Sequence, residues 1–226
     1  MLELKDVYGG YGKITILNGV SFSIPKGTIT TVIGPNGAGK STVFKAIFGL
    51  LDVHSGQVLL EGRDVTRLAP RQMIAEGVTY VPQGRNVVPQ LSVYHNLELG
   101  GITAPDQARV RDRKAVELSG GQQKQLEVAR SLLLDPKLIL IDEPSIGLSP
   151  NLVQEVFRTL TRLRDEGVTI LMVEQNAKAA LAMSDYGLVL ELGQTRMHDE
   201  AAKLLADPRV GQLFLGGHVD EPHAAH

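Results

Sequence analysis

Short apolar runs alternate with amphipathic stretches along most of the chain. Runs of four to six residues rich in β-branched side chains predict strands, and longer runs with apolar positions three or four apart predict helices. The predicted strands are Val20–Ile24, Thr28–Ile33, Gln57–Leu60, Val78–Val81, Leu138–Ile141, Val168–Val173 and Leu188–Leu192. The predicted helices are Ser41–Leu51, Ser119–Leu134, Leu152–Glu166 and Ala177–Met183. This alternation predicts an α/β fold whose mostly parallel sheet is covered on both faces.

Three parts of the chain depart from this alternation. The first three predicted strands follow one another closely and predict a small strand-rich layer. Between Gln83 and Leu118 no strand is predicted, which indicates a helical subdomain of about residues 84–135. Residues 217–226 lose periodicity and predict a flexible tail. A chain of 226 residues suits one domain that contains these parts as subdomains.

The composition narrows the class of protein. Hydrophobic residues make up 43% of the chain and charged residues 21%, as in soluble globular domains and unlike disordered chains. The net charge of -2 and the lack of a Lys or Arg cluster give no reason to expect nucleic acid as a partner. The absence of cysteine excludes disulfides and thiolate metal sites. Charges in Met1–Asp6 and the lack of a membrane-length apolar stretch predict a cytosolic chain, so a membrane-spanning part would belong to another chain.

A glycine-rich loop at residues 34–42 lies between a predicted strand and a predicted helix. Its sequence, Gly-Pro-Asn-Gly-Ala-Gly-Lys-Ser-Thr, fits the phosphate-binding (Walker A) pattern G-x-x-x-x-G-K-[ST] in the setting that the pattern requires. Glycines let backbone N–H groups face phosphate oxygens, Lys40 adds a cation, and the Ser41 hydroxyl is suited to Mg²⁺. An ordinary glycine-rich turn is the alternative. The residues expected to bind ATP here are Asn36, Gly37, Ala38, Gly39, Lys40, Ser41 and Thr42.

Two adjacent carboxylates, Asp142 and Glu143, follow the apolar run Leu138–Ile141. Charged groups at the end of a buried strand are unfavourable unless something uses their charge. This Walker B arrangement predicts that Asp142 holds Mg²⁺, directly or through water, and that Glu143 polarises or orients the attacking water. A strand that simply meets solvent is the alternative.

The sequence Leu-Ser-Gly-Gly-Gln at residues 118–122 begins a predicted helix just upstream of the acidic pair. A serine hydroxyl and glycine N–H groups at a helix N-terminus can bind an anion, although the same residues could be only a helix cap. In this order the three motifs resemble those of ABC (ATP-binding cassette) ATPases, over Met1 to about Gly216. The resemblance implies a P-loop NTPase (RecA-like) fold with an N-terminal antiparallel β-subdomain. It also implies that one set of residues closes over the γ-phosphate held by a partner subunit: Ser119, Gly120, Gly121 and Gln122.

Other positions follow the order of the family's motifs. Gln83, after a predicted strand, resembles the Q-loop glutamine, which touches Mg²⁺ and senses the membrane partner. Tyr11 is placed like the aromatic residue that stacks on adenine, and Ser145–Ser149 resembles the D-loop with Ser149 in place of a frequent Asp. The resemblance implies ATP and Mg²⁺ as cofactors, and as partners integral membrane permease subunits and a second ABC ATPase subunit, identical or different. It implies a peripheral location on the cytoplasmic face of the cell membrane.

The sequence departs from the family at the end of the strand predicted before Glu174. Most ABC ATPases have Glu-His there, and the histidine contacts the γ-phosphate, whereas this chain has Glu174-Gln175. Gln175 can donate only a neutral amide hydrogen bond, which is weaker than the charge-assisted bond of an imidazolium. Together with Arg85–Pro89 and Gly147–Pro150, the run Val173–Asn176 resembles the second ATPase subunit of branched-chain amino-acid importers, and urea and amide importers are similar.

Three functions are compatible with these features. The chain is the ATP-hydrolysing motor of an importer, a nucleotide-binding scaffold with little turnover, which Gln175 motivates, or a soluble ABC ATPase acting on ribosomes or DNA. The last class typically has tandem cassettes, coiled-coil insertions or basic surfaces, which this sequence lacks, so the importer motor is favoured. A second departure concerns length, because the stretch from Asn96 to Leu118 is short for the family and joins abruptly at Arg113–Lys114. Either the insertion is truncated or a stretch is absent from this sequence.

Overall fold

The computed structural model describes residues 1–84, 86, 87, 89–98 and 112–214. The strands are β1 (Leu2–Tyr11), β2 (Ile14–Ile24), β3 (Ile29–Ile33), β4 (Asp52–Leu60), β5 (Arg63–Asp64), β6 (Val78–Val81), β7 (Leu138–Asp142), β8 (Thr169–Val173), β9 (Tyr186–Glu191) and β10 (Gln194–Glu200). The helices are α1 (Lys40–Ile47), α2 (Pro70–Ala75), α3 (Val93–Glu98), a 3₁₀ turn (Ala115–Glu117), α4 (Gly120–Leu132), α5 (Pro150–Asp165), α6 (Ala177–Met183), α7 (Ala201–Ala206) and α8 (Pro208–Phe214). None of these described helices has the length and apolar composition needed to cross a membrane. Predictions for Arg85, Val88, residues 99–111 and the tail 217–226 lie outside the described residues.

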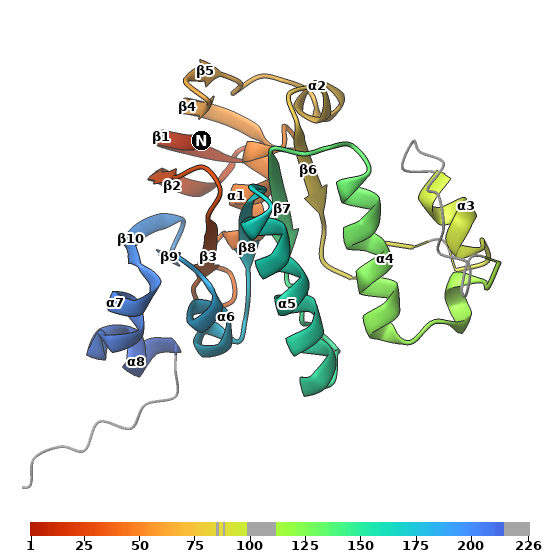
Figure 1. The fold of residues 1–226 in the computed structure, drawn as a ribbon. Coiled ribbons are helices and arrows are strands. Elements are labelled where there is room, and N and C mark those ends of the chain that lie inside the picture. Colours follow the sequence, from red (N-terminus) through yellow and green to blue (C-terminus); the bar gives the residue numbers. More distant parts are fainter. Residues whose placement is uncertain (85, 88, 99–111, 215–226) are drawn as a thin grey trace, which may run out of the picture.

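Two sheets with different strand directions build the fold (Figure 1). The first has the order β2-β1-β4-β5, and all its neighbouring strands are antiparallel. The second has the order β10-β9-β3-β8-β7-β6 and is parallel except for the β9–β10 pair. The predicted mostly parallel α/β sheet with an N-terminal antiparallel part is confirmed. Because β6, β7, β8, β3 and β9 are parallel, their carboxyl ends meet at one edge, where ligands commonly bind in such folds.

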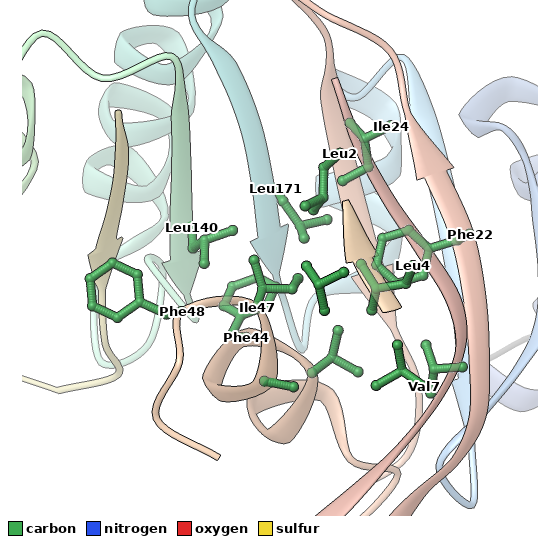
Figure 2. Packing of buried hydrophobic residues seen from close by; sticks show 14 of the residues in the cluster. Leu2, Leu4, Val7, Phe22, Ile24, Phe44, Ile47, Phe48, Leu140 and Leu171 are labelled. Carbon is green, nitrogen blue, oxygen red and sulfur yellow. The ribbon is translucent and has the colours of Figure 1, made fainter. Parts of the chain in front are cut away.

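The strands of the parallel sheet are buried on both faces, and alternate residues serve different cores. In β7, Leu140 packs into a cluster with α1 and the antiparallel sheet, whereas Ile139 packs against α5. Figure 2 shows the first cluster, in which side chains of β1 and β2 face Phe44 of α1 and Leu171 of β8. A shift of β7 by one residue would exchange the two faces, so this burial fixes the register that brings Asp142 to the strand end.

Helices α3 and α4 and the 3₁₀ turn share an apolar cluster of their own. Its buried members are Val87, Val93, Leu97, Ala115, Leu118 and Leu126. These elements lie beside β6, on the side of the sheet away from α7 and α8 (Figure 1). Leu118, which precedes Ser119, is therefore anchored in this cluster, whereas Val128 further along α4 packs into the core between β7 and α5.

Several elements differ from the sequence-based prediction. The strand expected over Thr28–Ile33, assigned to the N-terminal layer, is β3 in the middle of the parallel sheet, because its five residues are all buried and need neighbours on both faces. The helix expected over Ser41–Leu51 ends at Ile47, because Gly49 adopts a φ of 73° and ends the helical path. β1 and β10 were missed, since register shifts interrupt their alternation of buried and exposed residues. The short elements β5, α2, α7 and α8 were also missed.

The packing around Phe44 generates a stability prediction. This side chain is 0% exposed, and its ring meets that of Tyr80 edge-on at 6.1 Å between centroids. We expect Phe44→Ala to lower the free energy of unfolding by about 3–5 kcal/mol, because it leaves a cavity between α1 and the sheet. Ile14→Ala, at a side chain that is 67% exposed, should change it by about 0.5 kcal/mol or less. Urea unfolding followed by circular dichroism measures both, and equal losses would contradict the assigned core.

Candidate functional site

The loop between β3 and α1 presents a helix N-terminus at the carboxyl edge of the sheet. Gly39 is the N-cap of α1 and has a φ of 96°, a conformation that glycine adopts readily. A Cβ on Gly34 would lie 2.1 Å from the carbonyl oxygen of Leu190, so that only glycine fits there. The N–H of Gly193 donates to the carbonyl of Ala38 at 3.0 Å, which ties the loop to the β9–β10 turn. The first N–H groups of α1, which lack helical partners, are therefore held ready for an anion.

The side chain of Lys40, the first residue of α1, folds back into this loop. The side chain is 7% exposed, and its Nζ donates to the carbonyl oxygens of Gly34 at 2.8 Å and Pro35 at 3.0 Å. Burial lowers the pKa of Lys40, and the charges of Glu143 and Asp142 act in the opposite direction. The ammonium thus lies within electrostatic reach of the two carboxylates.

Asp142 ends β7 with one oxygen bonded and one free. The residue is 2% exposed, and the Tyr80 hydroxyl of β6 donates to its Oδ2 at 3.4 Å. Its Oδ1 is buried and has no hydrogen-bond partner within the described part of the chain. Burial raises the pKa of Asp142, whereas the nearby Ser41 hydroxyl lowers it. A carboxylate oxygen without a partner, close to a serine hydroxyl, is a suitable donor set for a hard cation such as Mg²⁺.

Glu143 is the point where three loops meet. The residue is 7% exposed and has a φ of 48°, an uncommon backbone conformation for a residue other than glycine. Nε2 of Gln83 donates to its Oε2 at 2.7 Å, and Nε2 of Gln175 lies 3.0 Å from both carboxylate oxygens. These three residues follow β7, β6 and β8, so the parallel sheet brings together positions that lie far apart in sequence. Both donors are amide groups, which carry no charge of their own.

Tyr11 lies at the end of β1, against the Walker A helix. Its ring is 46% exposed. The Nζ of Lys45 on α1 donates to the Tyr11 hydroxyl at 3.2 Å and lies 5.7 Å from the ring centroid. The aromatic face predicted to stack on adenine is therefore accessible and lies beside the helix that Lys40 begins.

Ser119 caps α4, and residues 118–122 do not reach the phosphate-binding loop, residues 34–42, of their own chain. The Gln122 N–H donates to Ser119 Oγ at 3.3 Å, and Gln122 Oε1 accepts from the Ser119 N–H at 3.0 Å. The serine oxygen accepts in this capping box, so its own O–H proton can still be donated elsewhere. Among the described residues, no hydrogen bond joins residues 118–122 to residues 34–42. The helix-cap interpretation and the anion-site interpretation are thus compatible with the same geometry.

A cavity of about 240 Å³ lies where the start of α4 meets the loops after β6 and β7. Its lining residues are Gly84, Gly120, Gln123, Lys124, Glu127, Ile146, Gly147 and Leu148. Lys124 Nζ donates to Glu127 Oε2 at 2.7 Å, and both side chains are buried. The other Glu127 oxygen accepts from the backbone N–H of Asn86. The buried pair therefore connects α4 to the segment that follows Gln83.

Sequence reasoning missed Tyr80, Glu174 and the Lys124–Glu127 pair as parts of the site. Tyr80 is one residue of a short apolar strand, and nothing in the sequence shows that its hydroxyl reaches Asp142. Lys124 and Glu127 are three residues apart on a helix, a spacing that is typical of an exposed ion pair. Glu174 was noted only as the neighbour of Gln175, yet it is 1% exposed and accepts hydrogen bonds from Ser145.

The close approach at Gly34 generates a prediction for nucleotide binding. We expect Gly34→Ala to weaken ATP binding by about tenfold or more and to lower the free energy of unfolding by about 1–3 kcal/mol. The reason is that the opposing atom is a backbone oxygen and cannot rotate away. Gly211→Ala on α8 is the control, because among the described residues no atom beyond its chain neighbours and its own helix backbone lies within 4 Å of the added Cβ. This control should be neutral or about 1 kcal/mol more stable. Fluorescent-nucleotide titration and urea unfolding measure both variants, and unaltered binding by Gly34→Ala would contradict the loop geometry.

Comparison with known proteins agrees with this site. The family described as "ABC transporter" matches residues 17–146. The high-affinity branched-chain amino acid transport ATP-binding protein BraG of Pseudomonas aeruginosa is 41% identical, over 96% of this chain and 100% of its own length. The probable branched-chain amino acid transport ATP-binding protein LivF of Archaeoglobus fulgidus is 38% identical, over 96% of this chain and 99% of its own length.

A solved structure supports the same assignment. The ADP conformation of MJ1267, an ATP-binding cassette of an ABC transporter, superposes with a TM-score of 0.84 at 29% identity. The match covers 96% of this chain and 99% of the other. The predicted family and fold are therefore confirmed, and the chain belongs to the ABC transporter family as an ATP-binding cassette, the ATPase unit of such a transporter.

Proposed function

We propose that this chain hydrolyses Mg²⁺-ATP to energise a membrane importer of branched-chain or other amino acids. The arrangement of Glu143 carries the proposal: a buried carboxylate with both oxygens oriented by amides, one residue after an aspartate with a free oxygen. The names of the BraG and LivF relatives, both branched-chain amino acid transport ATP-binding proteins, support the substrate class. The substrate itself would contact other subunits, so its identity rests on this likeness.

The phosphates of ATP would bind along residues 36–42. The N-terminal N–H groups of α1 suit the phosphate oxygens, and the Thr42 hydroxyl suits the α-phosphate region. Lys40 would exchange its two carbonyl partners for phosphate oxygens. That exchange is favourable because an ammonium bonds more strongly to an anion than to a neutral carbonyl. Tyr11 would stack on the adenine ring.

Asp142 and Ser41 would hold Mg²⁺, with Gln83 as a further oxygen ligand. The fit is good because Asp142 Oδ1 is buried without a partner. The described residues contain no group of three or more His, Cys, Asp or Glu side chains that could bind a metal alone. Mg²⁺ in such sites is usually bound through one or two carboxylates together with substrate phosphates, and Asp142 supplies that carboxylate here. The bound ion would neutralise charge on the phosphates.

Glu143 would orient the attacking water and accept its proton. Gln83 and Gln175 orient the carboxylate by hydrogen bonds from their amide groups. When ATP binds, the Gln175 amide can turn toward the γ-phosphate. Its lack of charge predicts weaker stabilisation of the transition state than a protonated histidine would give. This observation also favours a second candidate, a nucleotide-binding scaffold with little turnover.

A complete ATP site would need two chains. The anion site formed by Ser119, Gly120, Gly121 and Gln122 would close over the γ-phosphate bound by a partner ATPase subunit, identical or different. The lack of hydrogen bonds between this site and residues 34–42 of the same described chain supports that arrangement. Residues of about 84–135 would form the helical subdomain that contacts integral membrane permease subunits. The chain would then lie peripherally on the cytoplasmic face of the membrane.

Replacement of Glu143 separates hydrolysis from binding. We expect Glu143→Gln to lower kcat of the assembled transporter by about a hundredfold or more, because the amide cannot accept a proton from water. ATP affinity should stay within about threefold, since the residue lies beside the phosphate loop rather than in it. Phosphate release and nucleotide titration provide the two measurements. Near-zero turnover in both proteins, with normal binding, would favour the scaffold over the motor.

Import is tested by reconstitution with permease subunits. We expect the chain to co-purify with integral membrane permeases, and proteoliposomes that carry the complex and its binding protein to accumulate leucine only with ATP on the side of this chain. The Glu143→Gln complex is the control and should assemble but not transport. Recovery of the chain with ribosomes or DNA in place of permeases would contradict the proposal.

A further inference from the structure

Glu174 makes three hydrogen bonds that join two loops of the site. Its Oε1 accepts from the backbone N–H of Ser145 at 2.9 Å, and its Oε2 accepts from the Ser145 hydroxyl at 2.8 Å. The backbone N–H of Gln175 donates to the same Oε2 at 3.1 Å. A single carboxylate therefore connects the loop after β7 to the end of β8.

These hydrogen bonds extend the connection between β7 and β8 beyond the end of their ladder. The ladder between β7 and β8 ends at the pair Asp142 and Val173, and its last backbone bond runs from Glu143 N–H to the Val173 carbonyl at 2.9 Å. After that point the segment that follows β7 leads to α5, and the segment that follows β8 leads to α6. The Glu174 side chain continues the connection by one more step, because Ser145 is two residues after Glu143.

Glu143 and the hydrogen bonds of Glu174 form one closed ring of contacts. Gln175 donates from its side chain to Glu143 and from its backbone to Glu174. Glu174 in turn holds Ser145, and the chain returns from Ser145 to Glu143 through Pro144. A displacement of either loop would therefore change the direction of the Glu143 carboxylate.

The hydrogen bonds of Glu174 are buried in the protein interior. Glu174 is 1% exposed, so water does not compete for its oxygens. Burial raises the pKa of Glu174, and the hydrogen bonds from Ser145 lower it. All three partners are donors, which suits an ionised carboxylate and suits an amide poorly. Burial of a charged carboxylate costs desolvation free energy, so a contact that only joined two loops would be more stable with uncharged groups.

We propose that Glu174 is a positioning residue for ATP hydrolysis, whose carboxylate clamps the loop after β7 to the strand end that carries Gln175 and so fixes the direction of Glu143. The inference rests on the proposed function, because it concerns the same carboxylate. It adds a role for a residue that need not touch nucleotide. The clamp also holds the start of residues 146–149, of which Ile146 is 44% exposed.

The test compares kcat, KM for ATP and local hydrogen exchange in the full-length chain within its assembled transporter. We expect Glu174→Gln to lower kcat by about tenfold to a hundredfold, because small misplacements of a catalytic group have effects of this size. KM should change by about threefold or less, since the phosphate loop is untouched. The amides of Ser145 and Gln175 should exchange faster in the nucleotide-free variant. A rise in KM together with losses of kcat and thermal stability would indicate a general structural role and overturn the proposal.

Ser145 supplies a milder variant and a rescue. Ser145→Ala removes one of the three bonds and should lower kcat by less than Glu174→Gln does, whereas Ser145→Thr keeps the hydroxyl and should recover most of the rate. The double variant should be about as slow as Glu174→Gln alone, because both changes break the same contact. Effects that multiply in the double variant would overturn the clamp.

Two controls separate this inference from the proposed function. Glu166→Gln makes the same chemical change at an exposed residue at the end of α5 and should leave kcat, KM and exchange unaltered. If the wild type hydrolyses ATP, Glu143→Gln does not, and Glu174→Gln keeps at least half of the wild-type rate, the inference fails while the proposed function stands. If the wild-type transporter hydrolyses no ATP, the proposed function fails and the clamp loses its role with it.

Discussion

The burial of four charged side chains at one edge of the parallel sheet is the constraint on which the rest of the structure depends. Lys40, Asp142, Glu143 and Glu174 are each 7% exposed or less. Buried charges are unfavourable unless they are bonded or used, and each of these is relieved differently. Loop carbonyls hold Lys40, two amides hold Glu143, and the loop after β7 holds Glu174. Only Asp142 keeps an oxygen without a partner, which gives the site a place for a cation.

The two cores on either side of β7 make this edge rigid. Leu140 faces the cluster of α1 and the antiparallel sheet, and Ile139 faces α5, so a slip of β7 by one residue would exchange the two buried faces. The third packing unit, around α3 and α4, is joined to this edge in two ways. The buried Lys124 and Glu127 side chains bond to the backbone of Gly84 and Asn86. Val128 of α4 also packs into the core between β7 and α5. Apolar packing therefore fixes where the charged groups lie, and hydrogen bonds between loops fix how they point.

Sequence reasoning succeeds where a local pattern leaves few structural solutions. The loop at residues 34–42 combines glycines, Lys40 and Ser41 in a spacing with one common use, and the four consecutive apolar residues Leu138–Ile141 strongly favour a buried strand. It fails where the outcome depends on which strands are neighbours. β3 was assigned to the wrong layer, and the contacts of Gln83 and Gln175 with Glu143 follow from the order β8-β7-β6, which no local pattern contains. The buried Lys124–Glu127 pair was missed for a different reason, since its spacing alone is typical of an exposed helix face.

The most direct test of this account is a crystal structure of Glu143→Gln with Mg²⁺ and ATP. The account predicts that Lys40 Nζ leaves the carbonyls of Gly34 and Pro35 for phosphate oxygens, and that the metal contacts Ser41 and the free oxygen of Asp142. A nucleotide bound while Lys40 stays on those two carbonyls and Asp142 Oδ1 stays without a ligand would contradict it.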